Sequence, residues 1–241
     1  MKTVLITGGS SGIGLECVKK FHANKYNVIN IDVTPPEIER GVFLQANLLN
    51  MDEISDVFSV IAQKFSIDVL VSNAGIHYSA KLEDTSEEAF DRVLSINFKS
   101  AFFVLKECIK LMKVRGGKVI TIASEQVFIA KPQSAIYGAT KAALAQLTKS
   151  IAIDYSKYNI IANCICAGTI ETPLYWNALK KHSENSGVNI ETIHRSENEL
   201  QPIGRIGSTK DVASLAFYLA NEAGNFIQGA MIPIDGGYTA K

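Results

Sequence analysis

The chain has 241 residues, enough for one large α/β domain or two small ones. Hydrophobic residues make up 47%, which is sufficient for a buried core, and no apolar run approaches the roughly 20 residues of a transmembrane helix. Lysine plus arginine and aspartate plus glutamate balance at 24 each, so no charge excess indicates binding to nucleic acid or to an anionic membrane.

The N-terminal stretch MKTVLITGG reaches glycine too early for the hydrophobic core and cleavage site of a signal peptide. We therefore expect a cytoplasmic protein. The four cysteines (Cys17, Cys108, Cys164 and Cys166) form no CxxC pair. Cys164 and Cys166 fall on one face of a predicted strand, where thiols behave as small hydrophobic groups. We expect buried thiols, with a metal or disulfide role as the less favoured interpretation.

Short apolar runs alternate with helical patterns along the whole chain. Runs of strand length lie at 3–8, 27–32, 42–47, 68–73, 118–124, 160–166 and 229–235, and helical patterns lie at 12–24, 51–64, 86–112, 135–157 and 209–221. Near-continuous Val, Ile and Leu indicate strands that are buried on both faces of a parallel sheet. The alternation predicts an α/β fold: a Rossmann-type, doubly wound parallel sheet of about seven strands with helices on both faces, in a single domain over 1–241.

The first strand runs into a glycine-rich turn, TGGSSGIG at 7–14, which opens the first helix. Gly8, Gly12 and Gly14 are spaced G-x-x-x-G-x-G, which differs from the dinucleotide fingerprint G-x-G-x-x-G. Glycines still let the backbone approach a pyrophosphate, and the free N–H groups of the helix N-terminus meet its negative charge. Alone, such a turn is weak evidence for a nucleotide site.

Asp32 strengthens this interpretation because it ends the second predicted strand, downstream of Gly14. A ribose-binding acid is expected about 20 residues beyond the glycines, and Asp32 lies close to that spacing. Its carboxylate can accept hydrogen bonds from both ribose hydroxyls and repels a 2′-phosphate. Val33 follows it, and the glycine turn holds no arginine or lysine to neutralise an extra phosphate. The pattern predicts NAD rather than NADP as the cofactor.

The segment SAIYGATKAAL at 134–144 places Tyr137 and Lys141 four positions apart, on one face of a helix. An ammonium about 4 Å from a phenol, at an effective dielectric constant of about 20, contributes about 4 kcal/mol, or about three pKa units. We therefore expect Tyr137 to be an acid/base with a lowered pKa. Ser124 ends the fifth strand upstream of this helix, where its hydroxyl can hold a substrate oxygen against the phenol.

With these motifs the chain resembles the short-chain dehydrogenase/reductase family over essentially its whole length. The resemblance rests on TGGSSGIG, Asp32, NAG at 73–75, Asn97 in SINF, Ser124, YGATK and the ending IDGGYTA at 234–240. It implies that Tyr137 is the general acid/base and that Lys141 lowers its pKa and binds the ribose. It also implies that Ser124 positions the substrate oxygen and that Asn97 holds a water in a proton relay.

The resemblance also implies a cofactor site and no metal. The implied cofactor residues are Gly8, Ser10, Ser11, Gly12, Ile13, Gly14, Asp32, Val33, Asn47, Leu48, Asn73, Ala74, Gly75, Tyr137, Lys141, Gly168, Ile170 and Thr172. Two positions depart from the family pattern. Ala167 precedes Gly168 where the family usually has proline, which predicts a looser bend and looser nicotinamide positioning. Asn47 replaces an aspartate that bonds the adenine amino group, and its side-chain oxygen can accept the same bond.

The stretch at about 173–205 reads as the one irregular region, and its place after a strand predicts a substrate lid. Its side chains Tyr175, Trp176, His182, His194 and Arg195 slightly favour a polar or anionic small molecule. His77 is more simply a partly exposed loop histidine than a substrate contact. Glu125 and Gln126, directly after Ser124, are weak candidates for the pocket wall.

The leading hypothesis is an NAD-dependent oxidoreductase that interconverts a secondary alcohol and a ketone, with the proton moved by Tyr137. A 3-oxoacyl-carrier-protein reductase is one alternative, but it would be expected to use NADPH and to carry a basic patch. A catalytically silent NAD(H)-binding sensor or scaffold is another, although the chain keeps every catalytic residue of the family. The resemblance also suggests a homotetramer or dimer assembled through 86–112 and 135–157.

Overall fold

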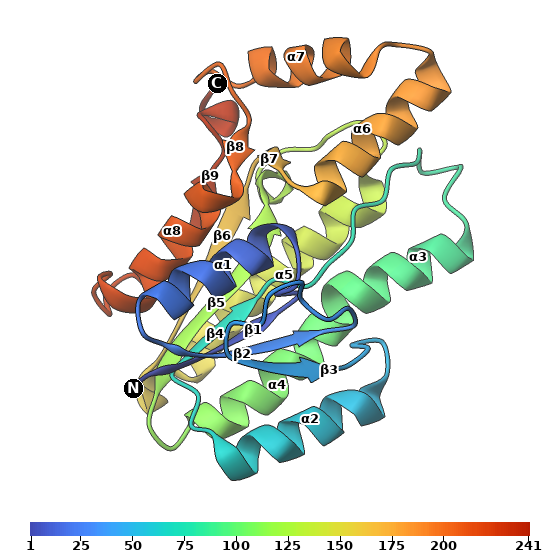
Figure 1. Cartoon of the computed structure of the whole chain (residues 1–241). Coiled ribbons are helices and arrows are strands. Elements are labelled where there is room, and N and C mark those ends of the chain that lie inside the picture. The colour runs from blue at the N-terminus through green and yellow to red at the C-terminus, as the bar shows by residue number, and fades with distance from the viewer.

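Seven parallel strands form the centre of the protein, in the order β3-β2-β1-β4-β5-β6-β9 (Figure 1). The computed structural model describes all residues, 1–241. The strands are β1 Thr3–Thr7, β2 Asn27–Asp32, β3 Val42–Gln45, β4 Val69–Ser72, β5 Gly117–Ser124, β6 Ile160–Ala167 and β9 Met231–Ile234. The chain starts at β1, builds outward to β3, and then returns to place β4 on the other side of β1. Ligands bind at such a reversal in doubly wound sheets, and the predicted fold is confirmed.

Helices cover both faces of the sheet. On one face lie α1 (Gly12–Ala23) and α8 (Thr209–Asn221), and on the other α2 (Met51–Lys64), α4 (Ser100–Met112) and α5 (Ala135–Asp154). Side chains alternate along β1: Val4 and Ile6 belong to the hydrophobic cluster of α1 and α8, whereas Leu5 belongs to the cluster of α2, α4 and α5. Because both faces are buried, the strand is apolar at nearly every position.

The segment 86–112 is helical almost throughout, as its pattern predicts, but a π-helical turn interrupts the α-helix. α3 (Glu87–Leu94) passes into the π-helical turn η1 (Ser95–Lys99) before α4 begins. Asn97 lies in this turn with no solvent exposure, and its amide bonds both backbone groups of Ile76. The wider π turn lets a polar side chain reach the neighbouring loop, and such turns are frequent at functional sites.

The prediction of an irregular stretch at 173–205 is wrong, because α6 (Pro173–Ser186) and α7 (Ile190–Leu200) occupy most of it. Thr172 caps α6 by accepting a hydrogen bond from the Tyr175 N–H at 3.1 Å, and Pro173 takes the first helical position. Asn189 caps α7. Both helices are rich in polar residues, and the apolar period of α7, Ile190 and Ile193, is short, so the polar composition hid it in the sequence. A small two-stranded sheet, β7 (Ile170–Glu171) with β8 (Gly207–Ser208), joins the ends of this segment.

The remaining elements are α5, which ends close to its predicted limit, and three short 3-10 turns. α5 stops at Asp154, and a 3-10 turn, η3 (Ser156–Tyr158), follows it, while η2 (Glu125–Val127) and η4 (Tyr238–Ala240) are further 3-10 turns. All four cysteines are buried, as predicted, and the sulfur atoms of Cys164 and Cys166 lie 4.0 Å apart. None of the helices combines the length and the apolar character required to cross a bilayer.

Candidate active site

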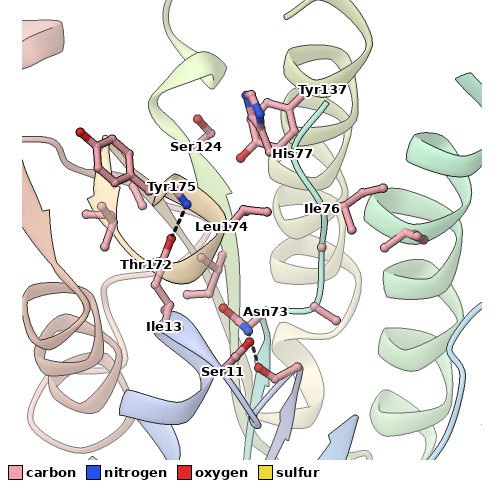
Figure 2. Close-up of a pocket in the computed structure, with 18 of the residues that line it drawn as sticks. Ser11, Ile13, Asn73, Ile76, His77, Ser124, Tyr137, Thr172, Leu174 and Tyr175 are labelled. Carbon is pink, nitrogen blue, oxygen red and sulfur yellow. Dashed lines mark hydrogen bonds between the residues drawn. The ribbon is translucent and has the colours of Figure 1, made fainter. Parts of the chain in front are cut away.

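A cleft of about 700 Å³ opens at the carboxyl ends of the central strands (Figure 2). Its lining includes most of the predicted site residues: Gly8, Ser11, Gly12, Ile13, Asp32, Val33, Asn47, Leu48, Asn73, Ala74, Gly75, Ser124, Tyr137, Lys141, Gly168, Ile170 and Thr172. Ser10, Gly14 and Asn97 do not line it. Tertiary structure therefore gathers residues from across the chain into one cavity.

The glycine turn presents bare backbone to the cleft. Gly8 and Gly12 have φ values of 67° and 52°, in the left-handed region that favours glycine. A Cβ on Gly14 would lie 1.9 Å from the Gly8 carbonyl oxygen, so α1 can approach the turn this closely only with glycine there. Because the glycines carry no side chains, a ligand can approach the backbone N–H groups at the N-terminus of α1. Such a site fits the pyrophosphate of a dinucleotide.

Asp32 lies at the end of β2, beside this turn. Its carboxylate accepts hydrogen bonds from the backbone N–H groups of Ser10 at 3.0 Å and Thr34 at 3.2 Å. The neighbouring Val33 is 52% exposed. The cations that line the cleft are Lys131 and Lys141, and both come from segments after β5 rather than from the first two βα units. The Asp32 end of the cleft therefore carries negative charge without a lining cation.

Asn73 ties the glycine turn to the neighbouring strand. Its side-chain amide donates to the carbonyl oxygens of Thr7 at 3.0 Å and Gly8 at 3.1 Å, and its own N–H donates to the Thr7 hydroxyl. Figure 2 shows this side chain beside the turn. β1 and β4 are thus linked at the point where the sheet reverses direction.

The cleft brings Ser124, Tyr137 and Lys141 together. Ser124 ends β5, while Tyr137 and Lys141 share one face of α5, with the ammonium 5.7 Å from the centroid of the phenol ring. The Lys141 Nζ donates to the carbonyl oxygen of Ile122 at 3.0 Å. Ser124 and Tyr137 face the same part of the cleft in Figure 2. A substrate oxygen between their two hydroxyls would meet both.

The expected lowering of the Tyr137 pKa is not found among the chain's own residues. Burial raises the pKa of Tyr137 to about 12, and a hydrogen bond with Ser124 offsets part of this effect. Burial likewise lowers the pKa of Lys141 to about 8. Desolvation destabilises the charged form of each group, and the negative charge of Glu125 raises the pKa of Tyr137 further.

Asn97 and Lys141 meet on either side of Gly75. A Cβ on Gly75 would lie 3.2 Å from the Asn97 Oδ1 and 3.4 Å from the Lys141 Nζ. Asn97 also donates to the Thr140 hydroxyl at 3.3 Å, directly before Lys141 in the chain. A side chain at Gly75 would therefore crowd both the buried amide and the ammonium.

The two departures from the family pattern have different outcomes. Ala167 is the last residue of β6, paired with Ser124 on one side and Ile234 on the other, and the looser nicotinamide positioning beyond it stays a prediction. At the adenosine end, the Asn47 Oδ1 already accepts a hydrogen bond from the Leu49 N–H at 3.0 Å. A carbonyl oxygen has two lone pairs, so it retains capacity for one further donor.

Sequence reasoning missed part of the wall beyond Ser124. Lys131 and Glu197 line the cleft together with Glu125, and Lys131 forms an ion pair with Glu125. Lys131 belongs to a loop and Glu197 to α7, so no local pattern marks either residue. Burial raises the pKa of Glu125, and the charge of Lys131 offsets part of that increase.

Of the side chains singled out in the 173–205 stretch, Tyr175 lines the cleft, whereas Trp176, His182, His194 and Arg195 do not. His194 instead accepts or donates a hydrogen bond at 2.8 Å to the Tyr175 hydroxyl and stacks on Trp176. These contacts fasten α6 to α7. The charges used to favour an anionic substrate are therefore outside the cavity.

His77 lines the cleft with one side open to solvent. Its ring packs edge-on against Tyr137, with the centroids 4.9 Å apart (Figure 2). Partial burial lowers the pKa of His77, and the positive charge of Lys131 lowers it further. A neutral imidazole therefore borders the phenol at neutral pH.

Comparisons with known proteins agree with this geometry. The family model described as enoyl-(acyl carrier protein) reductase matches residues 8–239. A D-beta-hydroxybutyrate dehydrogenase of Rhizobium meliloti is 32% identical over 100% of this chain and 99% of its own length. An L-fucose dehydrogenase of Mus musculus is 32% identical, covering 98% and 88%. A crystal structure of a short chain dehydrogenase family protein from Francisella tularensis superposes with a TM-score of 0.95, at 37% identity over 100% of both chains.

Proposed function

The chain belongs to the short-chain dehydrogenase/reductase family, and on that premise we propose that it is an NAD-dependent oxidoreductase that interconverts a secondary alcohol and a ketone. The observation that carries this proposal is the group of Ser124, Tyr137 and Lys141 at one end of a cleft whose other end holds the glycine turn and Asp32. Relatives that are named for the oxidation of hydroxyl-bearing compounds support it.

In the direction of oxidation, the substrate hydroxyl binds between the Ser124 and Tyr137 hydroxyls. Tyr137, as phenolate, accepts the proton of this hydroxyl. The hydrogen on the carbon that bears the hydroxyl leaves with its electron pair, as a hydride. Hydride acceptance is the chemistry that a nicotinamide supplies when bound. Burial raises the pKa of Tyr137 to about 12, so the phenolate would depend on the Lys141 ammonium together with the positive charge that an oxidised nicotinamide would bring when bound. We assign to Asn97 and Lys141 the passage along which the proton leaves.

The proposed cofactor is NAD. Asp32 supports this choice, because a carboxylate without a lining cation nearby favours ribose hydroxyls and repels a phosphate. The glycine turn would hold the pyrophosphate, and Ile170 and Thr172 would lie against the nicotinamide half. The α6–α7 segment (residues 173–200) would act as the substrate lid.

The same fold supports a proposed homotetramer. Phe90 of α3, Phe102 of α4 and Ile153 of α5 are exposed by 44%, 42% and 76%. Large apolar side chains on neighbouring exposed helices are typical of protein–protein interfaces. Light scattering on the purified chain measures the mass directly, and a monomer at micromolar concentration would contradict this part of the proposal.

Assays can distinguish the proposed function from two alternatives. A 3-oxoacyl-carrier-protein reductase would bind an acidic carrier, which the formal net charge of zero does not favour. A silent cofactor sensor would bind NADH without turnover. The reductase alternative predicts reduction of an acetoacetyl thioester with NADPH. The sensor alternative predicts NADH binding without formation of any product.

The test is a turnover screen of secondary alcohols with NAD+, followed by nicotinamide absorbance, on the wild type and on Tyr137→Phe. We expect the variant to lose turnover by about 100-fold or more, the range for general acid–base catalysis, while NADH binding is retained. Tyr218→Phe is the matched control, since Tyr218 lies on α8 outside the cleft. Equal turnover in wild type and Tyr137→Phe would refute the assignment.

A further inference from the structure

Beyond Ser124, four polar side chains follow one another along the wall of the cleft: Glu125, Lys131, Thr169 and Glu197, here called the polar row. Lys131 pairs with Glu125 and donates to the Thr169 hydroxyl at 3.3 Å, and that hydroxyl lies 3.5 Å from the Glu197 Oε2. Each member comes from a different part of the fold: η2, the loop before α5, the turn after β6, and α7.

The charges of the polar row do not suit an anionic substrate. Lys131 is the one cation of the cleft besides Lys141, and its ammonium is compensated by Glu125. Glu197 adds a negative charge on the same wall, and Asp235 also acts on Glu125. A carboxylate or phosphate on the substrate would meet no free positive charge there, so its desolvation would be unfavourable.

The polar row does suit hydroxyl groups. A hydroxyl both donates and accepts, and the row offers the Lys131 ammonium as a donor and the Glu197 carboxylate as an acceptor. Glu125 is 1% exposed, and its Oε2 has no hydrogen-bond partner. That oxygen lies beside Gly168, where a Cβ would be only 2.9 Å away, so the wall has no room for a side chain at this position and holds an unsatisfied buried acceptor.

Helix α6 adds carbon-rich side chains to the same cavity. Leu174, Tyr175 and Leu179 of α6 face the cavity (Figure 2 labels the first two). Pockets commonly combine carbon-rich walls with a few placed polar groups, and this combination fits a ring-shaped polyol, whose hydroxyls project at the edge and whose C–H groups form the faces.

We propose that the substrate is an uncharged polyhydroxylated alcohol of monosaccharide size, and that its non-reacting hydroxyls bind the polar row. This inference rests on the proposed function, since it names the substrate class of the same site. It selects uncharged sugars and cyclic polyols over hydroxy acids. Lys131 and Glu197 are the specificity-determining residues, while Tyr137 moves the proton for any alcohol that enters.

The experiment compares kcat/KM with NAD+ for aldopyranoses and cyclic polyols, for 3-hydroxybutyrate, and for cyclohexanol. We expect the best polyol to exceed both others by about 100-fold, because a site built for hydroxyls discriminates against compounds that lack them. A higher kcat/KM for 3-hydroxybutyrate, or Tyr137-dependent turnover limited to cyclohexanol, would overturn the inference and leave the proposed function standing. Silence across the panel with NADH still bound would overturn both.

Substitutions in the polar row test whether its side chains cause the preference for polyols. Glu197→Gln and Lys131→Met should each lower kcat/KM for the polyol by about tenfold or more, mainly through KM, as expected when one hydrogen bond to a charged group is lost. Turnover of cyclohexanol should stay within about twofold in Glu197→Gln, whereas Lys131→Met leaves the buried Glu125 unpaired and is expected to lower cyclohexanol turnover as well. Glu107→Gln and Lys110→Met are matched controls, because that ion pair lies on the exposed side of α4. Equal losses for polyol and cyclohexanol in Glu197→Gln, with an unchanged melting temperature, would contradict the assignment.

Discussion

The two ends of the cleft are built in different ways. At the cofactor end, the glycine turn, Asp32 and Asn73 are joined by hydrogen bonds that involve the backbone at nearly every step. At the substrate end, the polar row and the α6–α7 segment meet through side chains from separate parts of the chain. Backbone contacts tolerate few substitutions, whereas a wall of side chains can change composition without altering the sheet. The difference indicates where stability is concentrated and where specificity is set.

The largest effect is expected from a substitution at the cofactor end of the cleft. Gly14→Ala would place a methyl group 1.9 Å from the Gly8 carbonyl oxygen, so the turn or α1 must move. We expect a loss of about 3 kcal/mol or more of unfolding free energy, equivalent to a fall in melting temperature of roughly 6–12 °C. NADH binding should weaken in parallel. Gly224→Ala is the control, because nothing lies within 4 Å of its Cβ position. Similar melting curves for both variants would show that this end is not rigid.

Asp32→Ala tests the polarity of the same end. Removing the carboxylate removes the proposed hydrogen bonds to ribose and the repulsion of a 2′-phosphate. We expect the preference for NAD over NADP, measured as the ratio of kcat/KM values, to fall by about 10- to 100-fold. Asp52→Ala, at an exposed position on α2, is the control. An unchanged ratio would show that Asp32 does not select the cofactor.

Tyr175→Phe tests the substrate end. It removes the hydrogen bond to His194 and keeps the buried ring, so we expect the unfolding free energy to fall by about 1 kcal/mol. Proteolysis within the α6–α7 segment should accelerate, while NADH binding stays unchanged. Limited proteolysis read by mass spectrometry measures this. Cleavage that spreads equally to the cofactor end, from β1 to the turn after β4, would show that the two ends are not independent.

The smallest expected effect is the pH dependence of stability that comes from Asp211, at the start of α8. Ser208 caps α8, and the Asp211 carboxylate accepts hydrogen bonds from the Ser208 backbone N–H and hydroxyl and pairs with Arg205. The hydrogen bond from Arg205 is the largest cause that lowers the pKa of Asp211 to about 2. Since the folded pKa lies below the unfolded one, the contribution is complete above about pH 5 and is lost as the pH falls towards 2.

Because Asp211 is partly exposed, this contribution is about 1 kcal/mol or less. The measurement compares the unfolding free energies of wild type and Asp211→Asn at pH 6 and pH 3. We expect the gap between them to narrow at pH 3. A gap that widens on acidification would contradict the sign of the shift.

Much of the site was predictable because its chemistry depends on short local spacings. The glycine turn, Asp32 and the Tyr137–Lys141 pair each lie within one element or one turn, and a parallel sheet brings strand ends to the same edge. The helices of 173–200 were missed because their composition is polar, although Ile190 and Ile193 form a short apolar period in α7, and their caps became evident only with the backbone in place. The pKa of Tyr137 was also missed, since burial depends on every element packed around it.

The sequence by itself determined the doubly wound sheet, the family and the positions of the residues proposed for cofactor binding and catalysis, because periodicity and short motifs encode local geometry. Only the tertiary structure decided the substrate end. Lys131 and Glu197 lie far apart in the sequence, and neither belongs to a motif. Their meeting at Thr169 depends on where the loop before α5, the turn after β6 and α7 come together, a long-range packing outcome that no local pattern carries.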